Sequence, residues 1–392
     1  MEGPRASVRA VRGLAAYSVL RQAADACQTL SINWFLAGSG SAALLGLAWI
    51  VSRLPWLLLP LAGAAADRVV RRRLVMAGDL LVAAAGLAVA LARWRAAALP
   101  FLALYGLGYC AVRPATKGLS REFLPAPHLA ARLSGLLTSL EYLALVVAEL
   151  ACGRWLLGRG LAVGLGCMAV LLAAGVAILG VAAPSPAGAP RRHAPALQTR
   201  GVLAQITAPP LRGPFILTVI CGACGFAVLP LAPLLAQRLH GGPTLYALLL
   251  AGYSLGAAAG AALARWAEGW RVGVRGAGLM WLAAAPAVAL APRLPVPGAI
   301  GCFCLLGLAS GFQDAGNAAR VAALVPPAAQ SQAMAMGSLI WRVPGVLAGA
   351  VVVLSAPLPP ARLCLILAAL LAVVAAGAAA RPAARAEARP AC

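Results

Sequence analysis

Long apolar runs alternate with short polar stretches along the whole chain. Two of these runs, residues 42–66 and 74–92, each approach the ~20 residues that a helix needs to cross ~30 Å of hydrocarbon. The stretch that joins them, GAAADRVVRRR at residues 63–73, holds one acid and four arginines. The pattern predicts two membrane helices connected by a tight, charged turn.

The same alternation continues to the C-terminal end and predicts an all-α integral membrane protein with twelve transmembrane helices. The predicted spans are residues 13–37, 42–66, 74–92, 97–119, 129–155, 161–182, 213–237, 245–266, 273–291, 296–321, 332–354 and 362–380. Residues 183–212 are rich in proline, alanine and arginine and contain no run long enough to span. We therefore expect an N-terminal six-helix half at 1–182, a cytoplasmic linker at 183–212, a C-terminal half at 213–380 and a cytoplasmic tail at 381–392.

Composition supports a membrane protein, and the charge describes its topology. Hydrophobic residues make up 62% of the chain, charged residues 11%, and the mean hydropathy is +0.89. A net charge of +22 would suit a nucleic-acid partner, but the arginines are spread over many loops and are not massed on one face. They collect in the loops that the spans place on one side, which is the positive-inside pattern. We expect a lipid bilayer and no nucleic acid as partner.

The first apolar run is predicted to be a retained helix that starts inside. Arg5, Arg9 and Arg12 precede it, and the run itself contains Arg21 and Asp25, which a cleaved signal peptide would lack. Both termini are therefore expected in the cytoplasm. The abundance of alanine, glycine and proline is typical of a high-GC bacterium, so the expected location is the bacterial inner (cytoplasmic) membrane, in a multi-pass topology.

The two halves of the sequence align with each other. VRGLAAYSVL from Val11 aligns with LRGPFILTVI from Leu211, and GAAADR from Gly63 aligns with GAALAR from Gly260. The segment that begins LYGLGYC at Leu104 aligns with the one that begins LLGLASG at residue 305, again about 200 residues later. This near-constant offset predicts a duplicated six-helix unit in parallel orientation.

The loop between the second and third predicted helices resembles that of the major facilitator superfamily, which runs glycine, three residues, Asp-Arg, two residues and a basic cluster. The matching positions are Gly63, Asp67, Arg68, Arg71, Arg72 and Arg73. Val70 stands where the family usually has glycine. The flanking LPWLLLPLAG and LVMAGDLL resemble the branch that contains enterobactin exporters and macrolide efflux proteins. The resemblance implies two six-helix halves and a gating loop, in which Asp67 faces the start of the eleventh helix when the protein is open to the outside.

By the same resemblance, the first, fourth, seventh and tenth helices line a central cavity. A charge at mid-bilayer costs at least ~2.5–3.5 kcal/mol, so it persists only where it faces water, a partner or a substrate. The predicted cavity residues for substrate or proton are Arg21, Asp25, Arg113, Lys117, Glu141, Asp314 and Arg342. Arg21 and Asp25 are four residues apart and can pair on one helix face. The internal alignment matches Arg113 with Asp314 and Glu141 with Arg342, which suggests ion pairs between the halves.

These residues lead us to expect a secondary active transporter that exports a small organic solute, such as a siderophore, drug or secondary metabolite, by proton-coupled alternating access. Coupling needs a carboxyl whose proton affinity differs between the two states, and Asp25, Glu141 and Asp314 are the candidates. The small positive surplus in the cavity favours a neutral or anionic solute, with a hydrophobic macrolide-like drug as an alternative. We expect a monomer without cofactor.

Three alternatives remain at this point: uptake by the same fold, a transport-inactive scaffold or sensor, and a membrane-embedded enzyme. An enzyme would need paired aspartates or a histidine pair at one rim, and His128, His193 and His240 stand alone. The ten cysteines show no Cys/His spacing for metal and are expected to pack in the core. AELACG at residues 148–153 lacks the glycine- and proline-rich pattern of drug and proton exchangers. We therefore expect no metal site and no enzyme.

Overall fold

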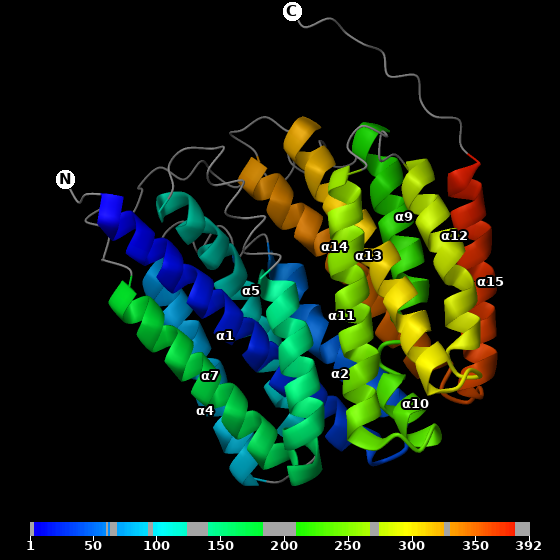
Figure 1. The fold of residues 1–392 in the computed structure, drawn as a ribbon, viewed down its shortest axis with the longest axis horizontal. Coiled ribbons are helices and arrows are strands. Elements are labelled where there is room, and N and C mark those ends of the chain that lie inside the picture. The colour runs from blue at the N-terminus through cyan, green and yellow to red at the C-terminus, as the bar shows by residue number, and fades with distance from the viewer. Residues whose placement is uncertain are drawn as a thin grey trace, which may run out of the picture.

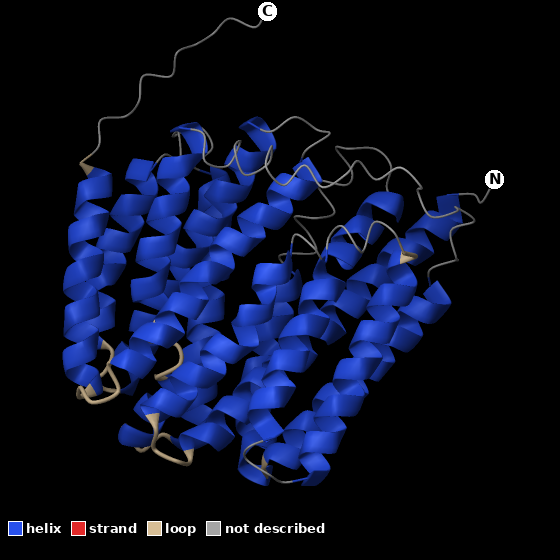
Figure 2. Cartoon of the chain, turned by 180° about the vertical axis from the view of Figure 1, so that it is seen from behind, coloured by secondary structure: helices blue, strands red, loops and turns tan. Residues whose placement is uncertain are grey.

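The computed structural model describes residues 4–59, 62, 69–92, 97–123, 140–182, 209–266, 274–324 and 330–380, and within these residues every regular element is a helix (Figures 1 and 2). In chain order they are α1 (Pro4–Ala37), α2 (Ala42–Arg53), η1 (Leu54–Leu58), α4 (Arg71–Ala92), α5 (Ala98–Phe123), a helix over 140–151, η3 (Cys152–Leu156), η4 (Leu157–Arg159), α7 (Leu161–Ala182), α9 (Pro209–Phe226), α10 (Ala232–Arg238), α11 (Gly242–Trp266), α12 (Val274–Leu290), α13 (Val296–Leu324), α14 (Gln330–Leu354) and α15 (Pro360–Ala379).

The helices follow the predicted apolar runs closely. α7 has the bounds expected for the run at 161–182, and α4 ends at Ala92 as predicted. In the part of the chain that the structure describes, five helices are long and apolar enough to cross a membrane. They are Arg71–Ala92, Leu161–Ala182, Gly242–Ala264, Val296–Asn317 and Pro360–Ala379. Several such helices in one chain are typical of a multi-pass membrane protein.

Two predicted spans are not the continuous helices that we expected. The run at 213–237 ends as helix at Phe226, turns over residues 227–231 and resumes as α10. Pro230 and Pro233 cause this break, because proline has no N–H to donate and its ring clashes with the preceding turn. In the run at 42–66, α2 ends at Arg53 and the chain tightens into the 3-10 helix η1, whose first turn contains Pro55.

The helices form two groups that lie side by side (Figure 1). In the first group α1 and α4 pack on α7, and α5 packs on α4 and α2. In the second group α11 packs on α13, α12 on α13 and α15, and α14 on α9. The start of α1, the end of α7, the start of α9 and the end of α15 lie at one end of the molecule, at the top of Figure 1.

The two groups touch near the opposite end. α2 meets α14 where Gly46 faces Gly349, so closely that a Cβ added to Gly46 would lie 2.8 Å from the Gly349 carbonyl oxygen. Trp34 near the end of α1 stacks on Tyr246 near the start of α11, with ring centroids 6.1 Å apart. Toward the end that carries Pro4, the helix axes of the two groups diverge (Figures 1 and 2).

α11 and α13 pack backbone against backbone because glycines line their contact. A Cβ added to Gly256 would lie 2.0 Å from the Cys304 carbonyl oxygen, and one added to Gly311 would lie 2.0 Å from that of Ala257. Small residues four positions apart allow backbones to approach in this way in membrane helix pairs.

Substitution of Gly256 by valine is therefore expected to separate α11 from α13 and to destabilise the protein. Overpacking of this kind costs ~1–3 kcal/mol or more. Melting of the purified protein in detergent measures the effect. Gly301→Val on α13 is the matched control, because a Cβ there meets nothing within 4 Å. Equal melting of the two variants would contradict the close-contact role of Gly256.

Candidate functional site

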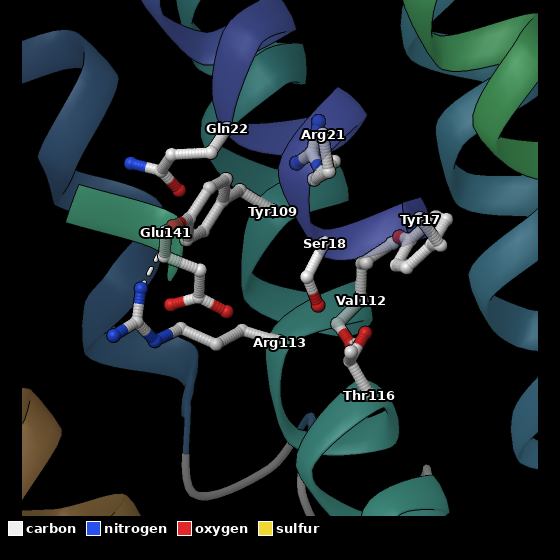
Figure 3. Close-up of a pocket in the computed structure, with 9 residues that line it drawn as sticks. All are labelled: Tyr17, Ser18, Arg21, Gln22, Tyr109, Val112, Arg113, Thr116 and Glu141. Atoms are coloured by element: carbon white, nitrogen blue, oxygen red, sulfur yellow. Dashed lines mark hydrogen bonds between the residues drawn. The ribbon is translucent and has the colours of Figure 1, made fainter. Parts of the chain in front are cut away.

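A pocket of about 450 Å³, counting its open mouth, lies between α1, α5 and the helix over 140–151 (Figure 3). All but one of its lining residues carry a polar group, and they are Tyr17, Ser18, Arg21, Gln22, Tyr109, Val112, Arg113, Thr116 and Glu141. Three of the predicted cavity residues, Arg21, Arg113 and Glu141, are thus brought together. Figure 3 shows Arg113 and Glu141 beside each other, with Arg21 and Gln22 projecting from α1.

Arg21 stands between two carboxylates. Its Nη1 lies 3.4 Å from Asp25 Oδ1, which confirms the pairing that the spacing along α1 suggested. Its Nε lies 3.3 Å from Oδ1 of Asp79, a fully buried residue on α4. One cation and two acids, all buried, leave this group with a negative surplus when both acids are ionised.

Each of the two acids of this group accepts a hydrogen bond from a tyrosine hydroxyl. Tyr17 donates to Asp79 Oδ2 at 2.6 Å, and Tyr105 donates to Asp25 Oδ1. The guanidinium carbon of Arg21 lies 4.9 Å from the centre of the Tyr109 ring, which is within the range of a cation–π contact. Hydrogen bonds and an aromatic face together hold charges that would otherwise be costly to bury.

Asp79 is the residue that the sequence interpretation missed, although a signal was present. It is an acid in the middle of the apolar helix α4, and an ionisable residue inside a membrane span is a candidate functional residue by that fact alone. The segment that contains it, LVMAGDLL, contributed only a family resemblance.

A second cluster joins arginines to aromatic rings where α2, η1, α5 and α14 meet. The arginine–aromatic cluster consists of Arg53, Arg113, Arg342, Trp49, Trp56 and Tyr109. The guanidinium carbon of Arg342 lies 3.8 Å from the Trp56 ring centre, and that of Arg53 lies 3.3 Å from Trp49. Arg113 donates from Nη1 to the Tyr109 hydroxyl at 2.7 Å (Figure 3).

Aromatic contacts do not fully compensate these charges. Both ion pairs among the described residues involve Arg21, so no described carboxylate lies within ion-pair distance of Arg53, Arg113 or Arg342. Glu141 and Asp314 act on Arg113 electrostatically from further away. A cation–π contact contributes ~0.5–2 kcal/mol, whereas taking a charge out of water costs several kcal/mol. The three arginines of the cluster are therefore left without a described counter-ion at ion-pair distance.

The ion pairs that the internal alignment suggested, Arg113 with Asp314 and Glu141 with Arg342, are not formed among the described residues. Arg342 of α14 lies instead over Trp56 of η1, so the contact between the groups at this place is a cation–π contact. A planar guanidinium stacks readily on an aromatic face, and here the ring is nearer than the acid.

The gating loop is described only in part. Gly63, Asp67 and Arg68 lie outside the described residues, as does the side chain of Lys117, whose backbone belongs to α5. Arg71, Arg72 and Arg73 form the first turn of α4. Arg72 donates from Nη2 to the carbonyl oxygen of Gly180, close to the C-terminal end of α7, where a positive charge is favoured by the helix dipole.

Glu149 is a buried acid that the predicted site did not include. It lies on the helix over 140–151 with 5% of its surface exposed, and Ser254 of α11 is a polar neighbour. Its Oε2 has no hydrogen-bond partner among the described residues. Glu149 thus places a carboxyl between the two groups of helices without a neighbouring cation at ion-pair distance in the described chain.

The second group contains a buried network of neutral polar side chains. The Thr218 hydroxyl of α9 accepts from Gln313 Nε2 at 2.9 Å and from Asn317 Nδ2 at 2.7 Å, both on α13. Trp281 of α12 donates to Gln313 Oε1. The two groups therefore differ in chemistry: buried ion pairs in one, neutral hydrogen bonds in the other.

A family model described as Major Facilitator Superfamily matches residues 15–349, and the chain belongs to that superfamily. The helical fold, the apolar spans and the polar pocket agree with this membership. The protein is accordingly a multi-pass membrane transporter and not an enzyme. A search of curated proteins finds no relative that matches the sequence.

Solved transporter structures share the fold. A mutant of nucleoside transporter NupG superposes with a TM-score of 0.75 at 14% identity, covering 94% of this chain and 98% of that one. A mutant of peptide transporter POT in complex with sulfate gives 0.75 at 14% identity, with 94% and 93% covered. A bacterial homolog of the human lysosomal transporter Spinster, inward-facing and unoccupied, gives 0.66 at 15% identity, with 96% and 95% covered.

Proposed function

We propose that this protein is a secondary active transporter that exports a small organic solute by proton-coupled alternating access. The observation that carries the proposal is the pocket between α1, α5 and the helix over 140–151, which is lined by charged side chains inside a membrane protein. Charges in that position have to face water, a partner or a substrate. Siderophores, drugs and other secondary metabolites are the solutes that the resemblance of residues 54–81 to efflux proteins favours.

We infer that the end of the molecule that carries Pro4 and Ala379 faces the cytoplasm, because the basic loops of the sequence belong to that side. The helix groups touch near the other end and diverge toward this one, so the structure would correspond to an inward-facing state. On this proposal the chain has twelve spans in two six-helix repeats, 1–182 and 213–380, joined by a linker at 183–212. It acts as a monomer in the bacterial inner membrane.

The loop with Gly63, Asp67 and Arg68 is proposed to stabilise the opposite, outward-facing state. Asp67 would then face the positively polarised start of the eleventh helix and lose this contact on switching. Asp67→Asn is expected to reduce transport severalfold while insertion and melting stay normal. Transport of the variant at the wild-type rate, measured in the same membranes, would argue against the gate.

The coupling proton is proposed to bind a carboxyl in the membrane interior. Asp25, Glu141 and Asp314 are the candidates from the sequence, and the burial of Glu149 adds a fourth. Asp25 is paired with Arg21 and accepts a hydrogen bond from Tyr105. Glu149 lies near Ser254 and Tyr246 of α11, and neither supplies a positive charge. Glu149 is our preferred carrier, because it is a buried carboxyl without a cation at ion-pair distance among the described residues.

Uptake and a transport-inactive scaffold are the rival functions. Nucleoside and peptide transporters share this fold, so the fold by itself leaves both solute and direction undetermined. The retained buried charges support transport over a scaffold.

Accumulation of labelled siderophore-like, macrolide and cationic dye compounds in cells with and without the protein tests export directly. Lower accumulation that a proton uncoupler abolishes is the expected result. Higher accumulation in cells with the protein would instead show uptake, and an unchanged panel, with the protein demonstrated in the membrane, would count against export.

A further inference from the structure

The arginine–aromatic cluster brings three cations from different parts of the chain to one place. Arg53 ends α2, Arg113 belongs to α5 and Arg342 to α14. Arg342 is close enough to each of the other two for like-charge repulsion. The assembly therefore spans the two groups of helices and concentrates positive charge at their contact.

Rings hold the guanidinium groups in place. The Trp56 and Tyr109 rings pack with centroids 4.5 Å apart, and the guanidinium carbon of Arg113 lies 5.9 Å from the first and 5.7 Å from the second. Arg342 lies against Trp56, as described above. A guanidinium that stacks by its flat face keeps its in-plane N–H groups for an oxyanion, which it binds in a two-pronged manner.

The close approach of α14 to α2 helps to hold the Arg53 side chain in the cluster. A Cβ added to Gly345 would lie 2.5 Å from Arg53 Cδ and 2.8 Å from its Nε. Glycine at this position thus leaves room for the Arg53 side chain between α2 and α14. Within the described residues the Arg53 guanidinium donates to the Ser52 hydroxyl at 3.1 Å and has no carboxylate at ion-pair distance.

No described acid forms an ion pair with an arginine of the cluster. Glu141 and Asp314 act on Arg113 electrostatically from further away, and Asp25 and Asp314 act on Arg342 in the same way. The in-plane N–H groups of the three guanidinium groups are therefore not engaged by a described carboxylate. Like charges at a buried helix contact are stable together when an anion joins them.

We propose that the arginine–aromatic cluster binds an oxyanion of the transported solute, so that the substrate is an organic anion with a carboxylate or phosphate group. This inference rests on the transporter function proposed above and names its substrate class. Arg113 and Tyr109 belong both to the cluster and to the pocket, so the body of the solute lies in the pocket between α1 and α5 while its anionic group meets Arg53, Arg113 and Arg342.

Binding to the purified full-length protein tests the proposal without transport. Trp49 and Trp56 lie in the cluster, so their fluorescence reports occupancy. The probes are benzoate, phenyl phosphate, the neutral benzamide, the cationic benzylamine and inorganic phosphate. We expect benzoate or phenyl phosphate to bind at least about tenfold more tightly than benzamide and benzylamine, as charge-assisted hydrogen bonds imply. Preference for inorganic phosphate over both organic anions would identify a free-ion site and overturn the organic substrate.

Matched variants locate the site. Arg342→Gln and Arg53→Gln are each expected to weaken anion binding about tenfold, and Arg342→Lys is expected to recover part of it. Arg293→Gln, at an exposed arginine outside the cluster, removes the same charge and is expected to change nothing. Melting of each variant checks that it is folded. Equal binding of benzoate and benzamide, no binding of any anion, or equal loss in the Arg293 variant would overturn the assignment.

Transport measured in parallel separates this inference from the proposed function. Anion binding that depends on Arg342, without proton-driven export of any anion, would keep the binding site and refute export. Proton-driven export of cationic or neutral solutes, with no anion bound, would keep export and refute the anionic substrate.

Discussion

Replacement of Arg21 by glutamine is expected to have the largest effect on stability of any single change in the pocket. The variant leaves Asp25 and Asp79 buried near each other without the cation that both contact. Removal of one partner from a buried ionic group costs ~3–5 kcal/mol, because uncompensated charge remains. Melting of the purified protein in detergent, followed by loss of the monodisperse peak in gel filtration, is the measurement.

We expect this loss of stability because of charge balance and not because of packing alone. A second substitution that restores the balance should therefore recover part of the stability. Arg21→Gln combined with Asp79→Asn removes one of the two like charges and is expected to melt above the single Arg21→Gln variant. The Tyr17 hydroxyl can still donate to the asparagine carbonyl oxygen, since it donates to Asp79 Oδ2 in the native protein. A double variant that melts no higher than the single one would show that the two sites do not couple.

Replacement of Glu149 by glutamine is expected to have the largest effect on energy coupling. In liposomes with an acidic interior, exchange of one proton per solute concentrates the solute about tenfold per pH unit. The variant, which can no longer release a proton at this position, is expected to bring the ratio of internal to external solute back to about one. Exchange of labelled for unlabelled solute at equal pH should continue, because binding and switching do not require the proton.

Glu149→Asp is the matched control for this experiment, since it retains a titratable group next to Ser254 of α11. It is expected to keep gradient-driven accumulation, although at a lower rate. Asp25→Asn tests the competing carrier on α1 in the same assay. Gradient-driven accumulation that persists in Glu149→Gln and disappears in Asp25→Asn would show that Asp25, and not Glu149, carries the coupling proton.

The parts of the fold that follow from local sequence were predicted well. A helix in a bilayer must satisfy its own backbone hydrogen bonds over ~20 apolar residues, so length and composition of a run are enough to define α7 or α4. Prolines at residues 230 and 233 and at residue 55 interrupt two runs, and their effect is equally local, although the prediction of continuous spans did not take it into account.

In the site, too, contacts within one helix could be predicted from the sequence and contacts between helices could not. Arg21 and Asp25 are four residues apart on one helix, so their pairing was visible from spacing alone. Asp79 joins them from another helix, 58 positions after Arg21 in the chain, because α4 and α1 both pack on α7. No periodic pattern in the sequence predicts that Asp79 lies next to Arg21.

By itself, then, the sequence determined which segments are helical, which side of the membrane the basic loops favour, and which family the gating loop resembles. Only the tertiary structure decided that Arg342 lies over Trp56 instead of pairing with Glu141, that Glu149 is buried against α11, and that three arginines meet at one contact. The physical reason is the distance along the chain over which each interaction acts. Hydrophobic length and helix spacing act within one segment, whereas the neighbours of a buried charge are set by how separate helices pack.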